Sequence, residues 1–181
     1  MNISDEDKGT LTDLAAKAVA SRVEGKLLPE PENPDGILLE TLGCFVTLTN
    51  SGQLRGCIGT FNPDRPLGEM IVQMGAAAAR DPRFVADPII TTELPELDIE
   101  VSILSPLEKT EKPEDLTPGT HGIYIISQGR SGCFLPEVAT DQGWGVEEFL
   151  GYCCSHKARL PYDAWKDPET DVYLFTSQKF H

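Results

Sequence analysis

Two β-rich runs on either side of a tight turn constrain the fold of this chain more than any other stretch. Residues 44–49 and 54–61 flank the turn Asn50-Ser51-Gly52. Short apolar and β-branched runs around an Asn/Ser/Gly turn are typical of a β-hairpin. We therefore predict an antiparallel pair of strands here, around which the remaining elements assemble.

The second run of this hairpin is the best candidate for a functional site. In a regular strand, side chains alternate between two faces. The alternation places Leu54, Gly56, Ile58 and Thr60 on one face, and Arg55, Cys57, Gly59 and Phe61 on the other. The first is the predicted core face. The second carries a thiol next to a guanidinium, and the glycines would let a ligand or another backbone approach closely.

Hydrophobic periodicity predicts helices and further strands in the rest of the chain. Apolar residues recur at spacings of three and four in the helical segments and alternate with polar residues in 97–103. The predicted helices cover residues 5–22, 67–80 and 146–157, and the predicted strands cover 97–103, a second hairpin at 123–135, and 171–180. Hairpin-paired strands with helices between them indicate an α+β fold with mainly antiparallel sheets.

The composition limits the partners that the chain can bind. Its 181 residues carry a net charge of −14, which opposes binding to the phosphate backbone of nucleic acids. No apolar run reaches the roughly 18 residues of a membrane span, and the acidic N-terminus is unlike a secretion signal. We therefore expect a cytoplasmic protein that binds neither nucleic acid nor membrane.

The arginines are unevenly distributed. Four of the seven lie between Arg55 and Arg83, where the nearby carboxylates are Asp64, Glu69 and Asp81. One interpretation is structural ion pairing, in which Asp81 caps backbone amides or holds Arg83. The other is a locally positive site for a carboxylate, a phosphate or an acidic peptide.

Cys57 is the first candidate for catalysis. A neighbouring cation favours the reactive thiolate, and Arg55 could supply that cation. A cysteine nucleophile also needs a base, for which His121 is the candidate, with Glu100 as its possible orienting group. The alternative is a thiol that takes part in no reaction, because free cysteine is commonly a small core residue.

Motifs for metals and cofactors do not occur in the sequence. The five cysteines lack the Cys-x-x-Cys and His-Glu-x-x-His spacings of zinc sites and any paired spacing of a disulfide framework. Glycine loops for phosphate, a dinucleotide fingerprint and a serine elbow are also missing. We therefore expect reduced thiols, no metal and no cofactor.

Several motifs together resemble those of the AMMECR domain family. They are Leu-Arg-Gly-Cys-Ile-Gly at 54–59, Asp-Pro-Arg-Phe at 81–84, Glu-Val-Ser-Ile-Leu at 100–104, His-Gly at 121–122, Arg-Ser-Gly at 130–132 and Leu-Pro-Glu-Val-Ala-Thr at 135–140. The first of these is the hallmark of the family, and the resemblance covers nearly the whole chain. The chain departs from the family pattern at Glu137, where Gln is usual, and at Arg159, where Gly is usual.

The resemblance implies a single domain over 1–181 with two subdomains, a larger one of residues 1–61 and 97–181 and a smaller one of residues 62–96. It implies a five-stranded antiparallel sheet in the larger subdomain and a cleft between the two, faced by the hallmark motif. The residues that match the family's cleft positions or motifs are Arg55, Gly56, Cys57, Gly59, Asp81, Arg83 and His121. Memo-type and radical-SAM proteins are the partners that the resemblance suggests.

Two functions fit these observations. The first is a binding module whose cleft takes an acidic small molecule or a protein segment, held by Arg55 and Arg83 with Gly56, Gly59 and Asp81. The second is a cysteine-dependent transferase or hydrolase with Cys57 as nucleophile and His121 as base.

Overall fold

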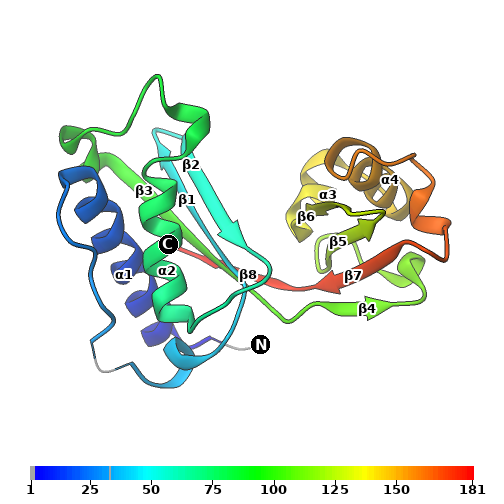
Figure 1. The fold of residues 1–181 in the computed structure, drawn as a ribbon, viewed down its shortest axis with the longest axis horizontal. Coiled ribbons are helices and arrows are strands. Elements are labelled where there is room, and N and C mark those ends of the chain that lie inside the picture. The colour runs from blue at the N-terminus through cyan, green and yellow to red at the C-terminus, as the bar shows by residue number, and fades with distance from the viewer. Residues whose placement is uncertain (1–2, 33) are drawn as a thin grey trace. The chain divides into compact units, whose positions relative to one another are not determined.

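The computed structural model describes residues 3–32 and 34–181, which form two compact units. The first unit comprises the residues up to Leu104 together with Gln178–His181, and the second comprises Ser105–Ser177 (Figure 1). Each unit combines helices with a four-stranded antiparallel sheet, so the predicted α+β class is confirmed. Within the described residues, no helix is both long and apolar enough to cross a membrane.

The predicted hairpin forms one side of the sheet of the first unit. The strands lie in the order β2-β1-β3-β8, with bounds Gln53–Thr60, Cys44–Asn50, Leu97–Leu104 and Ser177–Phe180. Ser51 and Gly52 both have positive φ, 51° and 76°, as the tight turns that suit the twist of a hairpin require. Because β2 stands first in the strand order, it is an edge strand with a sheet neighbour on one side only.

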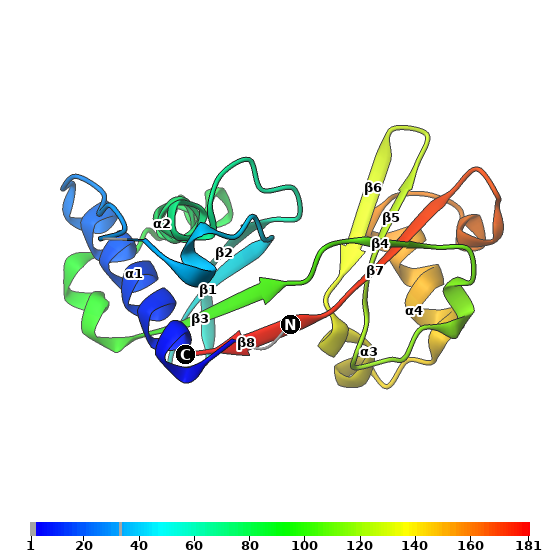
Figure 2. The ribbon, with the colours of Figure 1, turned by 90° about the horizontal axis from the view of Figure 1, so that it is seen from below.

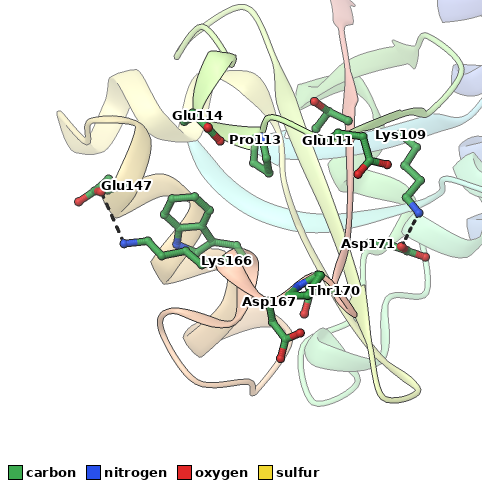
Figure 3. Close-up of a pocket in the computed structure, with 12 residues that line it drawn as sticks. Lys109, Glu111, Pro113, Glu114, Glu147, Lys166, Asp167, Thr170 and Asp171 are labelled. Atoms are coloured by element: carbon green, nitrogen blue, oxygen red, sulfur yellow. Dashed lines mark ion pairs between the residues drawn. The ribbon is translucent and has the colours of Figure 1, made fainter.

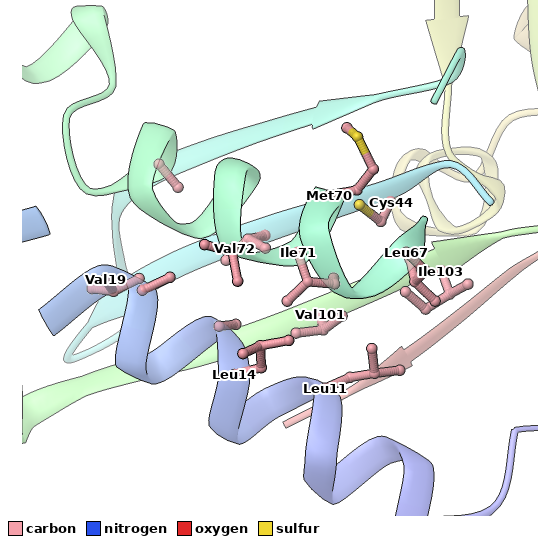
Figure 4. Close-up of a cluster of buried hydrophobic side chains, with 14 of the residues drawn as sticks. Leu11, Leu14, Val19, Cys44, Leu67, Met70, Ile71, Val72, Val101 and Ile103 are labelled. Carbon is pink, nitrogen blue, oxygen red and sulfur yellow. The ribbon is translucent and has the colours of Figure 1, made fainter. Parts of the chain in front are cut away.

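Two helices cover one face of this sheet. Helix α1 is Asp5–Glu24, capped by the Ser4 side chain, and α2 is Leu67–Ala78. Figure 2 shows both helices on the same side of the strands. Their apolar side chains meet those of the sheet in one core (Figure 4), which includes Leu11, Leu14, Val19, Cys44, Leu67, Met70, Ile71, Val72, Val101 and Ile103. Burial raises the pKa of the Cys44 thiol to about 12, so this cysteine is a core residue.

The second unit has its own sheet and core. Its strands lie in the order β4-β7-β5-β6, with bounds Glu108–Thr110, Asp171–Phe175, Gly122–Ser127 and Arg130–Phe134. Its helices are α3, Pro136–Gln142, and α4, Val146–Tyr152, which continues as a π-helical turn over Cys153–Lys157. The largest fully buried side chains here are Ile123, Ile125, Phe149 and Leu150.

Several elements differ from those expected. The strand predicted over 171–180 is interrupted at Thr176, whose N–H donates to Ser105 Oγ at 2.9 Å, and its two parts belong to different sheets. The sheet of the first unit has four strands where the resemblance implied five. Helix α3 was not predicted, because seven residues are too few to show a helical period.

The observed division of the chain also differs from the expected one. Residues 62–96 were expected to form a separate subdomain, but α2 buries its apolar face against β1 and β2. Those residues therefore belong to the first unit, and the chain leaves this unit only after Leu104.

Candidate functional site

The hallmark strand β2 binds a nearby loop through its free edge. The Cys57 N–H donates to Asp81 Oδ2 at 3.0 Å, and the Cys57 carbonyl accepts from Arg83 Nη2 at 3.1 Å. At an open sheet edge, such backbone groups would otherwise face water or another strand. The loop after α2 therefore occupies the position at Cys57 where a further strand would pair. We call Cys57, Asp81 and Arg83 the β2-edge site.

Asp81 is the buried anchor of this site. Pro82 prevents α2 from continuing, and Asp81 caps the short 3₁₀-helix Pro82–Phe84 by accepting from the Arg83 N–H at 3.0 Å. Its side chain is 1% exposed and also accepts from Arg83 Nε and Nη2. The Arg83 guanidinium, aided by the two backbone N–H groups, holds the pKa of Asp81 well below its usual value against the opposing effect of burial. The interpretation that Asp81 caps amides and holds Arg83 is confirmed.

Arg83 is held at one side and open at the other. Nε and Nη2 bind Asp81 and the Cys57 carbonyl, whereas Nη1 has no acceptor within residues 3–32 and 34–181. The side chain is 57% exposed and lies over the Phe84 ring at 5.7 Å from its centroid. A fixed guanidinium with a free N–H₂ edge is suited to bind an anion.

The Cys57 thiol lies in a row of polar side chains that crosses the sheet. Thr47 Oγ1 donates to Cys57 Sγ at 3.3 Å, and Thr47 is the register partner of Cys57 on one side and of Glu100 on the other. Glu100 in turn pairs with Lys179 at 3.0 Å.

Arg55 has a different role from the one expected for it. The register of β1 and β2 shifts between Leu48 and Thr49, so that Arg55 is the extra residue of a bulge, which breaks the regular alternation and re-aims side chains. Its Nε donates to Glu93 at 2.6 Å, and Nη1 donates to Asp87 at 2.8 Å. Nη2 donates to the second Glu93 oxygen and to the Asp87 carbonyl, both at 3.1 Å. The side chain is 13% exposed and fastens the loop that contains Asp87 and Glu93 to β2.

The two carboxylates that hold Arg55 were missed by the sequence analysis. They lie 32 and 38 positions away along the chain. In the sequence each of them is simply an acidic residue in a loop, and many other residues of this chain fit that description. The guanidinium that lies beside Cys57 is therefore that of Arg83.

The glycines of the motif make room for the chain itself. A Cβ at Gly56 would lie 2.1 Å from the Ala78 carbonyl oxygen, and one at Gly59 would lie 2.3 Å from the Phe45 ring. Since real Cβ atoms do not approach so closely, Gly56 lets α2 pack on the sheet and Gly59 accommodates Phe45. These contacts account for both glycines without a ligand.

His121, the predicted base, belongs to the second unit. Its Nδ1 accepts a hydrogen bond from the Thr117 N–H at 2.9 Å, so the neutral imidazole carries its proton on Nε2. Glu100, its predicted orienting group, belongs to the first unit and pairs with Lys179 there. The pairing of Cys57 with His121 stays a hypothesis.

An apolar cavity that the sequence analysis did not predict adjoins the β2-edge site. It has a volume of about 350 Å³ and is lined by Arg55, Ala79, Arg80, Asp81, Pro82, Phe84, Val85, Pro88 and Ile89. The Arg80 guanidinium binds the carbonyls of Ala79, Ile89 and Val23, which are neutral acceptors. Val85 is 80% exposed at its rim.

The charges around this cavity are balanced. Three arginines (Arg55, Arg80 and Arg83) and three carboxylates (Asp81, Asp87 and Glu93) lie in this region, in a chain of net charge −14. The region is therefore positive relative to the rest of the surface, and an anion meets less repulsion here than elsewhere. Within the described residues, no three His, Cys, Asp or Glu side chains gather as a metal site would need.

Comparison with known proteins finds one family profile and several relatives that match nearly the whole chain. The AMMECR1 family profile matches residues 12–180. A protein of Methanothermobacter thermautotrophicus is 39% identical over 99% of this chain and 96% of its own length, and Protein TK0174 of Thermococcus kodakarensis is 42% identical over 98% and 91%. The crystal structure of the uncharacterized protein PH0010 from Pyrococcus horikoshii superposes with a TM-score of 0.88 at 36% identity, covering 98% of this chain and 92% of that one.

Proposed function

The chain belongs to the AMMECR1 family, and from that premise we propose that its first unit is a binding module for an acidic ligand. The ligand is a small carboxylate or an acidic protein segment, and its anionic group binds the exposed edge of Arg83. Its apolar part enters the neighbouring cavity of about 350 Å³.

The observation that carries this proposal is the pairing of a buried carboxylate with an exposed guanidinium. Asp81 is 1% exposed and Arg83 is 57% exposed, so the protein orients the cation from beneath and leaves its outer edge to solvent. Ordering a free arginine upon binding would lose side-chain entropy, and this pre-orientation removes part of that loss. Hydrogen bonds between such a guanidinium and an anion contribute about 1.5–3 kcal/mol each.

Arg55 supports the site without touching the ligand in this proposal. All of its hydrogen bonds go to Glu93 and Asp87, so they hold the cavity's wall in place. Arg80 offers a second positive charge at the cavity and is fixed by backbone carbonyls. A ligand with a carboxylate at the end of an aliphatic chain matches this combination of charge and apolar surface.

The test is a titration with named probes. Hexanoate, adipate and an acetylated Glu-Leu-Glu peptide are added to ¹⁵N-labelled protein, and we expect the amide signals of residues 57 and 81–84 to shift saturably. Arg83→Lys keeps the charge but removes the planar fork, so the affinity should fall about tenfold. The matched control is Arg65→Lys, an exposed arginine paired with Asp64 and Glu69 elsewhere on the unit. Equal affinities of the two variants, or no shift at these residues with any probe, would remove the proposal.

A second candidate function is cysteine-dependent catalysis, favoured by the partly buried Cys57, whose thiol accepts a hydrogen bond from Thr47 and lies beside Arg83. In this proposal Cys57 is the nucleophile, and His121 is the hypothetical base. The test is the rate of alkylation by iodoacetamide against pH in a Cys133→Ser background, because the other three cysteines are buried. If Cys57 reacts no faster than a free thiol with a pKa of about 8.5, this function loses its support.

A further inference from the structure

The second unit contains a cavity that neither the family resemblance nor the β2-edge site involves. Its volume is about 570 Å³, which lies within the range of small-molecule sites. Figure 3 shows its walls, which come from β4 and the turn after it, from the start of α4, and from the loop before β7. The apolar part of the lining is formed by Trp165, Pro113 and Pro168.

Carboxylates outnumber cations in this cavity. Five of the lining residues are acidic and two are lysines. Each lysine already has a partner, Lys109 with Asp171 at 2.8 Å and Lys166 with Glu147 at 3.7 Å (Figure 3). The remaining three, Glu111, Glu114 and Asp167, form no ion pair within 4 Å in the part of the chain that the structure describes, although the charge of Glu111 also acts on Lys109. The cavity therefore has an uncompensated negative charge in a confined volume, which concentrates cations.

Trp165 supplies the second observation that points to a ligand. It lines the cavity while only 9% exposed, and its indole N–H has no hydrogen-bond acceptor among the described residues. Leaving a buried donor unpaired is unfavourable, and the nitrogen itself is covered by the protein, so an acceptor reaches it only after the ring moves. A ligand that carries an acceptor oxygen or nitrogen, met by a small shift of the ring, would pair with this donor.

The same tryptophan shows which charge the cavity accepts. The Lys166 ammonium lies 4.8 Å from the centre of the Trp165 ring and beside the Glu147 carboxylate. An aromatic face next to a carboxylate is a general arrangement for binding an ammonium group. A side chain of the protein thus occupies one such position, and the three unpaired carboxylates offer further ones.

We infer that this cavity binds a protonated aliphatic amine with two or more ammonium groups. The ammonium groups pair with Glu111, Glu114 and Asp167, and the carbon chain between them lies along Trp165 and the two prolines. A single metal ion fits less well, because the described carboxylates do not converge as a metal site requires. An anion is opposed by the net charge of the lining. The amine can be a free polyamine or a lysine side chain of a short peptide.

The test uses the full chain and two probes. Spermidine represents free polyamines, and acetyl-Lys-Lys-amide represents peptides and adds carbonyl acceptors for the indole N–H. The readout is tryptophan fluorescence in a Trp144→Phe background, which leaves Trp165 as the only emitting tryptophan of the two in the chain. We expect a saturable change at physiological salt with one probe or both, and the stronger binder identifies the source of the amine.

A matched pair of variants separates the cavity from general attraction to an acidic protein. Glu111→Gln with Glu114→Gln removes two cavity charges, and Glu96→Gln with Asp141→Asn removes two exposed charges elsewhere. We expect the first pair to weaken binding about tenfold and the second pair less than threefold. Equal weakening by the two pairs, or no saturable change with either probe, would overturn the inference.

Discussion

The β2-edge site and the cavity of the second unit use charge in opposite ways. At the β2 edge, Asp81 and Arg55 are almost covered, and their hydrogen bonds go to the protein itself. In the second-unit cavity the charged groups are exposed, and three carboxylates form no ion pair among the described residues. Buried ion pairs position a site because breaking them is costly, whereas exposed charges attract a ligand at little cost to stability. Substitutions of these groups should therefore change mainly stability in the first region and mainly ligand affinity in the second.

The largest effect should come from Gly56→Ala in β2. The new Cβ would lie 2.1 Å from the Ala78 carbonyl oxygen, so α2 would have to move off the sheet. We expect a loss of about 3 kcal/mol in the free energy of unfolding, measured by chemical denaturation. The control is Gly9→Ala in α1, where a Cβ meets nothing within 4 Å and where alanine should stabilise the helix by about 0.5–1 kcal/mol. Similar results for the two variants would mean that α2 does not rest on Gly56.

Asp81→Asn should have the next largest effect. It leaves Arg83 without its buried anion, and we expect a loss of about 2–3 kcal/mol at pH 7, against little change for the exposed Asp64→Asn. The folded-state pKa of Asp81 lies below the ordinary value of 3.8 because of Arg83, so its stabilisation is fully present above that pH and is lost as the pH falls below it. The difference between wild type and variant should shrink in acid, and a constant difference would contradict the ion pair.

A smaller effect is expected for Glu93→Gln. Arg55 lowers the pKa of Glu93, and the bidentate pair is partly buried, but Asp87 remains to hold the guanidinium. We expect a loss of about 1–2 kcal/mol and faster hydrogen exchange in residues 85–93, measured by mass spectrometry. Unchanged exchange there would show that Arg55 does not fasten this loop.

The smallest effect should come from Lys109→Met in the second unit. This lysine and its partner Asp171 are 51% and 41% exposed, so solvent screens their attraction. The free energy of unfolding should hardly change, while amine binding in the cavity should become tighter because one competing cation is gone. A loss of stability as large as that of Glu93→Gln would erase the distinction between the two regions.

Local patterns predicted most of the secondary structure. Three local signals were sufficient for four elements: the turn Asn50-Ser51-Gly52, the alternation in 97–103 and the helical spacing after Ser4. Each signal involves only residues that are close in the sequence, and α1, β1, β2 and β3 form as predicted. Helix α3 and the break at Thr176 were missed, because a short helix has no clear period and the break depends on a bond to the distant Ser105.

The candidate site could be predicted only in part. Cys57, Asp81 and Arg83 came from the sequence, and the structure brings them together in the first unit. The partner of each charge could not be predicted. Arg55 was expected to face a ligand, but a bulge and two carboxylates over thirty positions away bind it instead. The second-unit cavity left no local signal, because its walls come from segments around residues 110, 147 and 168.

Periodicity, turn chemistry and composition were enough to establish an α+β chain of antiparallel strands, with a strongly acidic surface and one arginine-rich segment. Which arginine is exposed, which carboxylate is buried and where the cavities lie depended on how the elements pack. The physical reason is the difference in the sequence distance over which these interactions act. Backbone preferences act over a few neighbouring residues, whereas ion pairing, burial and cavity shape depend on groups that only folding brings within a few ångströms of one another.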